Sequence, residues 1–170
     1  MIRHGEEKDL IDILEIYNEA ILNTTAVYTY KTQTLEERRN WFDNKISEGY
    51  PVYVFEYNNS VVGFATFGPF RPWQAYKYTI EHSVYVKKES RGKGIGISLL
   101  KEIIKDANKR GFATLVAGID SANSGSINIH KKLDFKYSGT IKKAGFKFNK
   151  WLDLAFYQLE LIGPKEPIEN

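Results

Sequence analysis

Three glycines alternate with basic or apolar residues in the segment Arg91-Gly92-Lys93-Gly94-Ile95-Gly96. The segment lies between an expected strand that ends at Val86 and an expected helix that starts near Gly94. Glycines let the backbone fold tightly with uncovered N–H groups, and the start of a helix adds the positive end of its dipole. The pattern therefore predicts an anion site, with phosphate as its usual occupant, in preference to a plain glycine-rich turn.

The spacing excludes two common phosphate motifs. The dinucleotide fingerprint, counted from Gly92, requires glycine at the position of Ile97. The nucleotide P-loop requires glycine at the position of Lys87 and a hydroxyl residue after Gly-Lys, where Gly94 stands. The phosphate ligand must therefore belong to another class.

The elements that would hold this segment can be read from periodicity and turn signals. Apolar residues at helical spacing predict a helix near residues 6–22, and a capping box formed by Thr34 and Glu37 opens a second helix that Gly49 ends. β-rich runs at 52–57 and 61–67 flank the turn Asn58-Asn59-Ser60 and predict an antiparallel hairpin. A third strand is expected at 79–86.

The second half alternates helices and strands. A helix should run from the glycine segment to Arg110 and stop at Gly111, followed by a strand at 115–119 and a helix around His130. Two β-rich runs at 135–141 and 151–161 close the chain. This order predicts a mixed α/β single domain with an antiparallel front half and a βαβ back half.

Composition limits the function classes. The chain has 170 residues, of which 42% are apolar and 26% charged, so one folded domain is expected and extensive disorder is not. The net charge of +3 is spread along the chain, which argues against a nucleic-acid binder. No cysteine is present, so disulfides and thiolate chemistry are excluded and a cytoplasmic location fits.

The sequence contains no membrane-spanning segment, no secretory signal and no metal-ligand spacing. We therefore expect neither a membrane partner nor a metal site. Residues 1–162 should form the domain, and residues 163–170 are polar and proline-broken, so this tail is expected to fray.

The glycine segment resembles the Arg/Gln-x-x-Gly-x-Gly signature of the GNAT acetyltransferases through Arg91, Gly94 and Gly96. Further stretches across residues 2–161 are similar to one GNAT branch, the phosphinothricin acetyltransferases, which also acetylate methionine sulfoximine and methionine sulfone. These stretches include Ile16-Tyr17-Asn18, Gly68-Pro69-Phe70-Arg71-Pro72, Glu81-His82-Ser83-Val84-Tyr85-Val86, Asn123-Ser124-Gly125-Ser126 and Lys147-Phe148-Asn149-Lys150-Trp151. The resemblance implies the GNAT fold, a mostly antiparallel sheet with splayed central strands flanked by helices.

The resemblance also implies acetyl-CoA as cosubstrate. Backbone groups of Val84, Tyr85 and Val86 would pair with the pantetheine arm, because an extended amide chain can add to a strand edge. Residues Arg91, Gly92, Lys93, Gly94, Ile95, Gly96 and Ile97 would bind the pyrophosphate. Asn123, Ser126 and the helix that they open would cover the thiol end.

Acetyl transfer to an amine requires a general base, because an amino group is mostly protonated at neutral pH. Glu81 lies on the expected strand 79–86, within the stretch that resembles the GNAT branch. Desolvation beside aromatic side chains would raise its pKa, and these are Trp73, Tyr76, Tyr78 and Tyr85. The alternative is a surface carboxylate on a strand.

Two histidines lie near these positions. His82 should face away from Glu81 and is interpreted as a hydrogen-bonded structural residue. His130 stands where many GNATs place a tyrosine that protonates the departing thiolate, so the resemblance makes His130 a catalytic candidate. Packing beside the cofactor is an equal alternative for His130.

The substrate residues are expected in aromatic loops. Arg71 could bind a carboxylate or phosphinate with its guanidinium fork. Phe70, Trp73 and Tyr28 could wall the pocket, and the loop residues Lys147 or Lys150 could add a second positive charge. The expected substrate is a small amino acid such as phosphinothricin, methionine sulfoximine or methionine sulfone. The alternatives are an acetyltransferase that acts on another small amine or on a peptide N-terminus, and a non-catalytic module that binds acyl-CoA.

Two positions depart from the branch pattern. Asp134 replaces the usual glycine at the end of a helix, and Asn149-Lys150 replaces the common Gly-Arg. Asp tolerates the left-handed conformation less well than glycine, so the first departure concerns local stability. The second could shift specificity. A homodimer is expected from the resemblance, together with an aromatic content of 14%.

Overall fold

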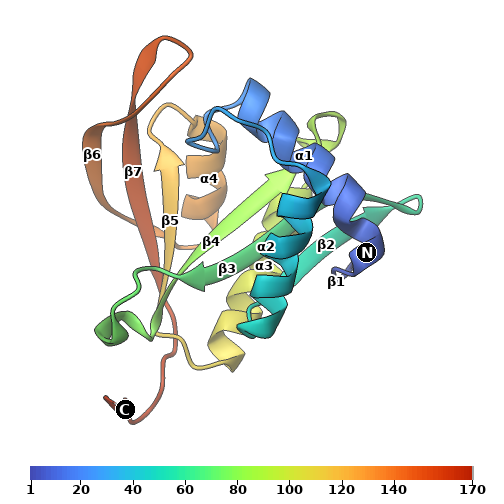
Figure 1. The fold of residues 1–170 in the computed structure, drawn as a ribbon. Coiled ribbons are helices and arrows are strands. Elements are labelled where there is room, and N and C mark those ends of the chain that lie inside the picture. Colours follow the sequence, from blue (N-terminus) through green and yellow to red (C-terminus); the bar gives the residue numbers. More distant parts are fainter. Residues whose placement is uncertain (170) are drawn as a thin grey trace. The chain divides into compact units, whose positions relative to one another are not determined.

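The computed structural model describes residues 1–169 and has a mixed α/β fold (Figure 1). Seven strands follow the order β1-β2-β3-β4-β5-β7-β6 in a mostly antiparallel sheet. The strands are β1 (Ile2–His4), β2 (Val52–Tyr57), β3 (Ser60–Pro69), β4 (Thr79–Val86), β5 (Thr114–Asp120), β6 (Lys136–Lys147) and β7 (Lys150–Glu160). The helices are α1 (Leu10–Asn23), α2 (Leu35–Ser47), α3 (Ile95–Lys109) and α4 (Ser124–Lys132), with short 3-10 turns at Glu7–Asp9, Gln74–Tyr76 and Lys88–Ser90.

The contacts divide the chain into two compact units. The first unit contains Met1–Thr66 and Ser83–Leu100, and the second contains Phe67–His82 and the chain from Lys101 onward. The continuous elements β3, β4 and α3 therefore have residues in both units. Each unit is described separately below.

The core of the first unit forms between α1, α2, β2 and β3. The apolar face of α1 contributes Leu10, Ile13 and Ile16, which pack with Phe42 of α2 and with Val52, Val54, Val61 and Phe64 of the two strands. The capping box is confirmed: the Thr34 hydroxyl accepts from the Glu37 N–H, and the Glu37 carboxylate accepts from the Thr34 N–H. Leu35 and Ile46 stay 39% and 51% exposed, so α2 buries a narrower face than its apolar residues indicate.

The expected hairpin is confirmed. β2 and β3 pair antiparallel, and the turn places Asn58 and Asn59 at φ 49° and 60°, the left-handed pair that twisted two-residue hairpins require. The strand β1 was not predicted. It has three residues and pairs antiparallel with β2, from Ile2 opposite Phe55 to His4 opposite Tyr53, and such a short strand gives no alternating pattern.

The second unit contains the predicted βαβ arrangement. β4 pairs parallel with β5 from Thr79 opposite Thr114 to Glu81 opposite Val116, and β5 pairs antiparallel with β7. β6 and β7 form a hairpin that is longer than expected, because β6 continues through an exposed lysine-rich stretch to Lys147. That stretch has no apolar alternation and contains an irregularity between Ile141 and Gly145, so the sequence gives no strand signal there.

Residues 161–169, which follow β7, have no regular secondary structure. The Leu161 N–H donates to the carbonyl of Ala113, and the Ile168 N–H donates to the Tyr78 hydroxyl at 3.1 Å. Asn170, the last residue of the expected tail, lies outside the described residues. Among residues 1–169, no helix has the length and apolar character that a membrane span requires.

Candidate active site

The glycine segment lies in the first unit, between the end of β4 and the start of α3. Gly92 and Gly94 have φ of 76° and 78°, a left-handed backbone that glycine adopts without strain. A Cβ at either position would meet no atom within 4 Å, so the conformation requires glycine while the adjoining space is open. The helix α3 starts directly afterwards at Ile95. This geometry suits an anion beside a helix N-terminus.

The basic side chains of the segment are bonded within the protein. Arg91 donates through Nε to the carbonyl of Val86 at 3.0 Å and forms an ion pair with Glu19 of α1 at 2.7 Å. Lys93 Nζ donates to the carbonyl of Glu89 at 2.9 Å. These contacts fix the loop conformation, so the backbone N–H groups are the more direct candidates for an anion.

The side chains of β4 have different surroundings. Val84 and Val86 are half-buried, and the Val86 side chain lies 3.7 Å from where a Cβ of Gly96 would stand. The Tyr85 ring packs in the first unit's core against Tyr17 and Phe64, with ring centroids 5.5 and 5.1 Å away. Tyr85 therefore anchors β4 with its side chain. Ile95 is buried, and Ile97 is half-buried on α3.

Glu81 lies in the second unit, against a glycine. A Cβ at Gly118 of β5 would stand 3.0 Å from Glu81 Oε1, 3.4 Å from Leu154 and 3.7 Å from Phe156. Burial raises the pKa of the Glu81 carboxyl, and the positive charge of Arg71 opposes that rise. The carboxylate thus has the desolvated environment expected of a general base.

The aromatic residues predicted beside Glu81 differ in burial. Trp73 and Tyr76 are 66% and 41% exposed, and Tyr85 belongs to the core of the first unit. The apolar neighbours next to Gly118 come from β7, as Leu154 and Phe156. The direction of the pKa shift is as expected, and the desolvation of Glu81 by the aromatic residues stays a prediction.

Arg71 and Phe70 lie together in the connection between β3 and β4. Arg71 donates to the carbonyl of Phe70 at 2.7 Å, and its guanidinium carbon lies 4.1 Å from the centre of the Phe70 ring. The Phe70 ring meets Tyr76 and Phe156 edge-on, at 5.7 and 6.5 Å. Arg71 itself is exposed. The structure therefore brings Arg71, Phe70 and Glu81 into one region of the second unit.

The two histidines are in direct contact. His82 Nε2 and His130 Nε2 are 3.1 Å apart, and His130 Nδ1 lies 2.7 Å from the carbonyl oxygen of Ser126. The alternation along β4 is as predicted, because His82 is buried and its neighbour Glu81 is half-buried. Asn123 caps α4 by accepting from the Ser126 N–H at 3.0 Å. Asn123 and Ser126 thus position the helix that carries His130.

Three other predicted positions lie in different surroundings. Lys147 is the last residue of β6 and not a loop residue; it is 5% exposed, and burial lowers its pKa. Lys150 begins β7 and is exposed, while Tyr28, in the connection between α1 and α2, is 39% exposed. Asp134 has φ 66°, the left-handed conformation expected where it replaces glycine.

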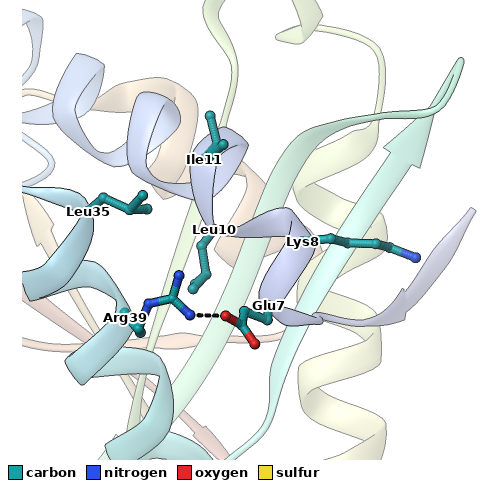
Figure 2. Close-up of a pocket in the computed structure, with 6 residues that line it drawn as sticks. All are labelled: Glu7, Lys8, Leu10, Ile11, Leu35 and Arg39. Atoms are coloured by element: carbon teal, nitrogen blue, oxygen red, sulfur yellow. Dashed lines mark hydrogen bonds and ion pairs between the residues drawn. The ribbon is translucent and has the colours of Figure 1, made fainter.

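A pocket of about 330 Å³ lies elsewhere in the first unit, beside α1 and α2 (Figure 2). Its lining is Glu7, Lys8, Leu10, Ile11, Leu35 and Arg39, and an ion pair joins Arg39 to Glu7. A second hollow of about 370 Å³ is lined by residues of α3, α4, β7 and their flanks. Neither lining includes a residue that the sequence indicated for chemistry.

Gly118 is the residue that sequence reasoning missed. It is an exposed glycine within a strand whose neighbours are buried. A glycine inside a strand often marks a close approach of another group, and this signal was present in Val116-Ala117-Gly118-Ile119. The pairing of His82 with His130 was also missed, because it joins residues 48 positions apart.

Residues 2–156 match the family described as the acetyltransferase (GNAT) domain. The methionine sulfoximine/methionine sulfone acetyltransferase of Pseudomonas aeruginosa is 43% identical over 161 residues, which cover 94% of each chain. An N-acetyltransferase from Staphylococcus aureus Mu50 is 57% identical, with a TM-score of 0.94 over 94% of this chain and 97% of that one.

A phosphinothricin acetyltransferase from Sinorhizobium meliloti, solved in complex with acetyl-CoA, is 37% identical. Its TM-score is 0.92, over 95% of this chain and 88% of that one. The similarity therefore spans nearly the whole chain, and it includes a solved structure that contains the acetyl donor.

Proposed function

Because the chain belongs to the GNAT acetyltransferase family, we propose that it moves the acetyl group of acetyl-CoA onto the amino group of a small amino acid. Methionine sulfoximine, methionine sulfone and phosphinothricin are the proposed substrates, since relatives at 43% and 37% identity carry those names. The observation that carries the proposal is the Glu81 carboxylate, held against Gly118 with a raised pKa.

The proton inventory of the reaction is simple. A protonated amine carries three protons and the amide product keeps one. One of the other two goes to Glu81, which frees the nitrogen lone pair to attack the thioester carbonyl carbon. The carbon–sulfur bond then breaks, and the departing thiolate takes the remaining proton. A carboxylate with a raised pKa suits the first transfer, because it is closer in basicity to the amine that it serves.

The acetyl donor is assigned to β4 and the glycine segment. Backbone groups of Val84–Val86 would pair with the pantetheine arm, and the N–H groups from Gly92 to Ile97 would bind the pyrophosphate. The left-handed glycines and the open space beside them support this assignment. Arg91 and Lys93 would act mainly by fixing the loop, and Asn123 and Ser126 by holding the start of α4.

The amino-acid substrate is assigned to the region around Arg71. The exposed guanidinium can form a bidentate pair with the carboxylate, while Phe70 and Trp73 provide apolar surface. Tyr28 and Lys147 remain proposed members of this site. For His130 both alternatives remain proposals, namely proton transfer to the thiolate and packing beside the cofactor, and both of its ring nitrogens have partners within the chain.

The test is a thiol-release assay with acetyl-CoA and a panel of amines. Methionine sulfoximine, methionine sulfone and phosphinothricin should give the highest kcat/KM, because a cationic polyamine would face Arg71. Spermidine and a peptide N-terminus are the comparison substrates. A higher kcat/KM with either comparison substrate would refute the substrate assignment, and thiol release with none of the amines would favour a non-catalytic acyl-CoA-binding module.

The same proposal includes three further points. The reaction needs no metal, it takes place in the cytoplasm, where acetyl-CoA is available, and the protein is a homodimer. Exposed aromatic residues on the β6–β7 hairpin favour an interface with a second copy: Tyr137, Phe146, Phe148 and Trp151 are 44% to 59% exposed. Light scattering at micromolar concentration should return the dimer mass, and the monomer mass would contradict it.

A further inference from the structure

Two imidazole rings meet in the buried part of the second unit. His82 of β4 and His130 of α4 are 9% and 5% exposed. Their ring planes differ by 11°, their Nε2 atoms are 3.1 Å apart, and Phe135 meets both rings edge-on at 5.8 and 5.0 Å. Two imidazoles at this distance must share a hydrogen between the Nε2 atoms, since two lone pairs would repel each other.

The backbone decides which ring donates. The Ser126 carbonyl can only accept, so His130 Nδ1, at 2.7 Å from it, must carry a hydrogen. A neutral His130 therefore has its lone pair on Nε2. The hydrogen between the rings consequently belongs to His82, which donates through Nε2 and keeps its own lone pair on Nδ1. Among the described residues, His82 Nδ1 has no hydrogen-bond partner, which costs less for a lone pair than for a buried N–H.

The surroundings disfavour a charge on either ring. Burial, together with the neighbouring His130, lowers the pKa of His82 to about 3. Burial also lowers the pKa of His130, although the Ser126 carbonyl acts in the opposite direction. An extra proton on His130 would stand on Nε2, directly against the Nε2–H of His82. An extra proton on His82 would stand on Nδ1, which is buried and has no hydrogen-bond partner among the described residues.

We propose that His82 is a positioning residue that holds His130 as the neutral Nδ1–H tautomer, with His130 Nε2 as a hydrogen-bond acceptor. The consequence for catalysis, which rests on the proposed function, is that His130 has no hydrogen on Nε2 to give to a departing thiolate. The proton inventory does not require one, since the amine supplies both transferred protons. The pair instead fixes the orientation of α4 against β4 without introducing a charge.

The direct test is nitrogen NMR of the full chain labelled with ¹⁵N-histidine. The sequence contains three histidines, so the spectrum holds three imidazoles, and the exposed His4 is an internal reference. Long-range ¹H–¹⁵N spectra at neutral pH should show His130 protonated at Nδ1 and His82 protonated at Nε2, and both should remain neutral well below pH 6.5. A His130 protonated at Nε2, or a His82 that titrates near pH 6.5, would overturn the proposal.

Two variants separate positioning from simple packing. In His82→Gln the amide nitrogen can occupy the place of Nε2 and donate to His130, whereas in His82→Leu no donor remains. The glutamine variant should keep the His130 tautomer and the wild-type kcat. The leucine variant should let His130 exchange between tautomers and should lower kcat by about tenfold, the low end of the loss seen when an orienting partner is removed.

The kinetic and spectroscopic results answer different questions. If the wild-type chain transfers no acetyl group, the proposed function fails while the tautomer assignment still stands on the NMR spectra. If His82→Leu keeps the His130 tautomer unchanged, the positioning role is refuted, whatever the activity of the variant. The wild-type spectra test the tautomers even if His82→Leu does not fold.

Discussion

Glu81 is the residue at which burial and chemistry coincide, and its substitution gives the first prediction. Glu81→Gln keeps the shape but removes the basicity, so kcat should fall by about 10²–10⁴. In the wild type, kcat/KM should rise with pH through the raised pKa of Glu81, because the carboxylate must be deprotonated to accept a proton. The variant should lack this rise.

Steady-state kinetics from acidic to neutral pH measure both effects, because the pKa of Glu81 is raised above its ordinary carboxyl value. Glu36→Gln is the matched control, because Glu36 is an exposed carboxylate in the first turn of α2. Unchanged turnover of Glu81→Gln at every pH would assign the base to another group.

Gly118 gives a second prediction at the same scale. In Gly118→Ala the new methyl group would stand 3.0 Å from Glu81 Oε1, which is tighter than nine in ten real Cβ contacts. The flexible carboxylate is the group that moves, so the strand should survive while kcat falls on the order of tenfold to a hundredfold from misplacement of the base.

A double-mutant cycle tests whether Gly118 acts through Glu81. In the Glu81→Gln background, Gly118→Ala should add little further loss, because the misplaced base is already absent. The same loss in both backgrounds would mean that the methyl group obstructs the substrate instead. Thermal melting of both single variants checks that the fold is intact.

At the scale of elements, the glycine segment before α3 gives the third prediction. Gly94→Val places a β-branched side chain at φ 78° and into the space assigned to the pyrophosphate. Acetyl-CoA binding by calorimetry should weaken severely. Gly49→Val is the matched control, because Gly49 also has φ 78° and an open Cβ direction but lies at the end of α2.

Both variants should lose a similar stability of about 1–2 kcal/mol from the left-handed backbone. If acetyl-CoA binding weakens in Gly94→Val but not in Gly49→Val, the cause is therefore the side chain in the ligand site and not the strained backbone. If Gly94→Val bound acetyl-CoA with wild-type affinity, the assignment of the pyrophosphate to this segment would be wrong.

Local signals explain how far the sequence could predict the elements. The capping box at Thr34, the left-handed asparagines of the β2–β3 turn and the glycine segment are each defined by a few consecutive residues. The short β1 and the continuation of β6 to Lys147 have no such signal. Both depend on pairing with a distant strand, which supplies hydrogen bonds without requiring an apolar pattern.

The site was predictable as separate residues but not as contacts. Arg71 could be named from its residue type and loop, and Glu81 and His130 could be named from the resemblance to the GNAT family. Their partners could not, because Gly118, Phe156 and His82 come from other elements. The β7 residues Leu154 and Phe156 beside Gly118 could not be named for the same reason, since they come from a strand distant in sequence.

For the whole molecule, two buried titratable sites make stability depend on pH in opposite directions. Glu81 has a raised pKa, so the folded chain binds more protons than the unfolded chain just above the ordinary carboxyl pKa. Its contribution to stability therefore decreases as the pH rises through that window. The histidine pair has lowered pKa values, so here the unfolded chain binds more protons and stability decreases as the pH falls.

The fourth prediction concerns the acid side of this balance. The free energy of unfolding should decrease as the pH is lowered through 6.5 toward about 3, the unfolded and folded pKa values of His82. Urea denaturation from neutral pH down to about pH 4 measures the slope, and the paired variant His82→Gln should show a shallower one because one buried imidazole is gone. Equal slopes for the wild type and His82→Gln would mean that His82 binds its proton equally well in both states, which its burial against His130 does not allow.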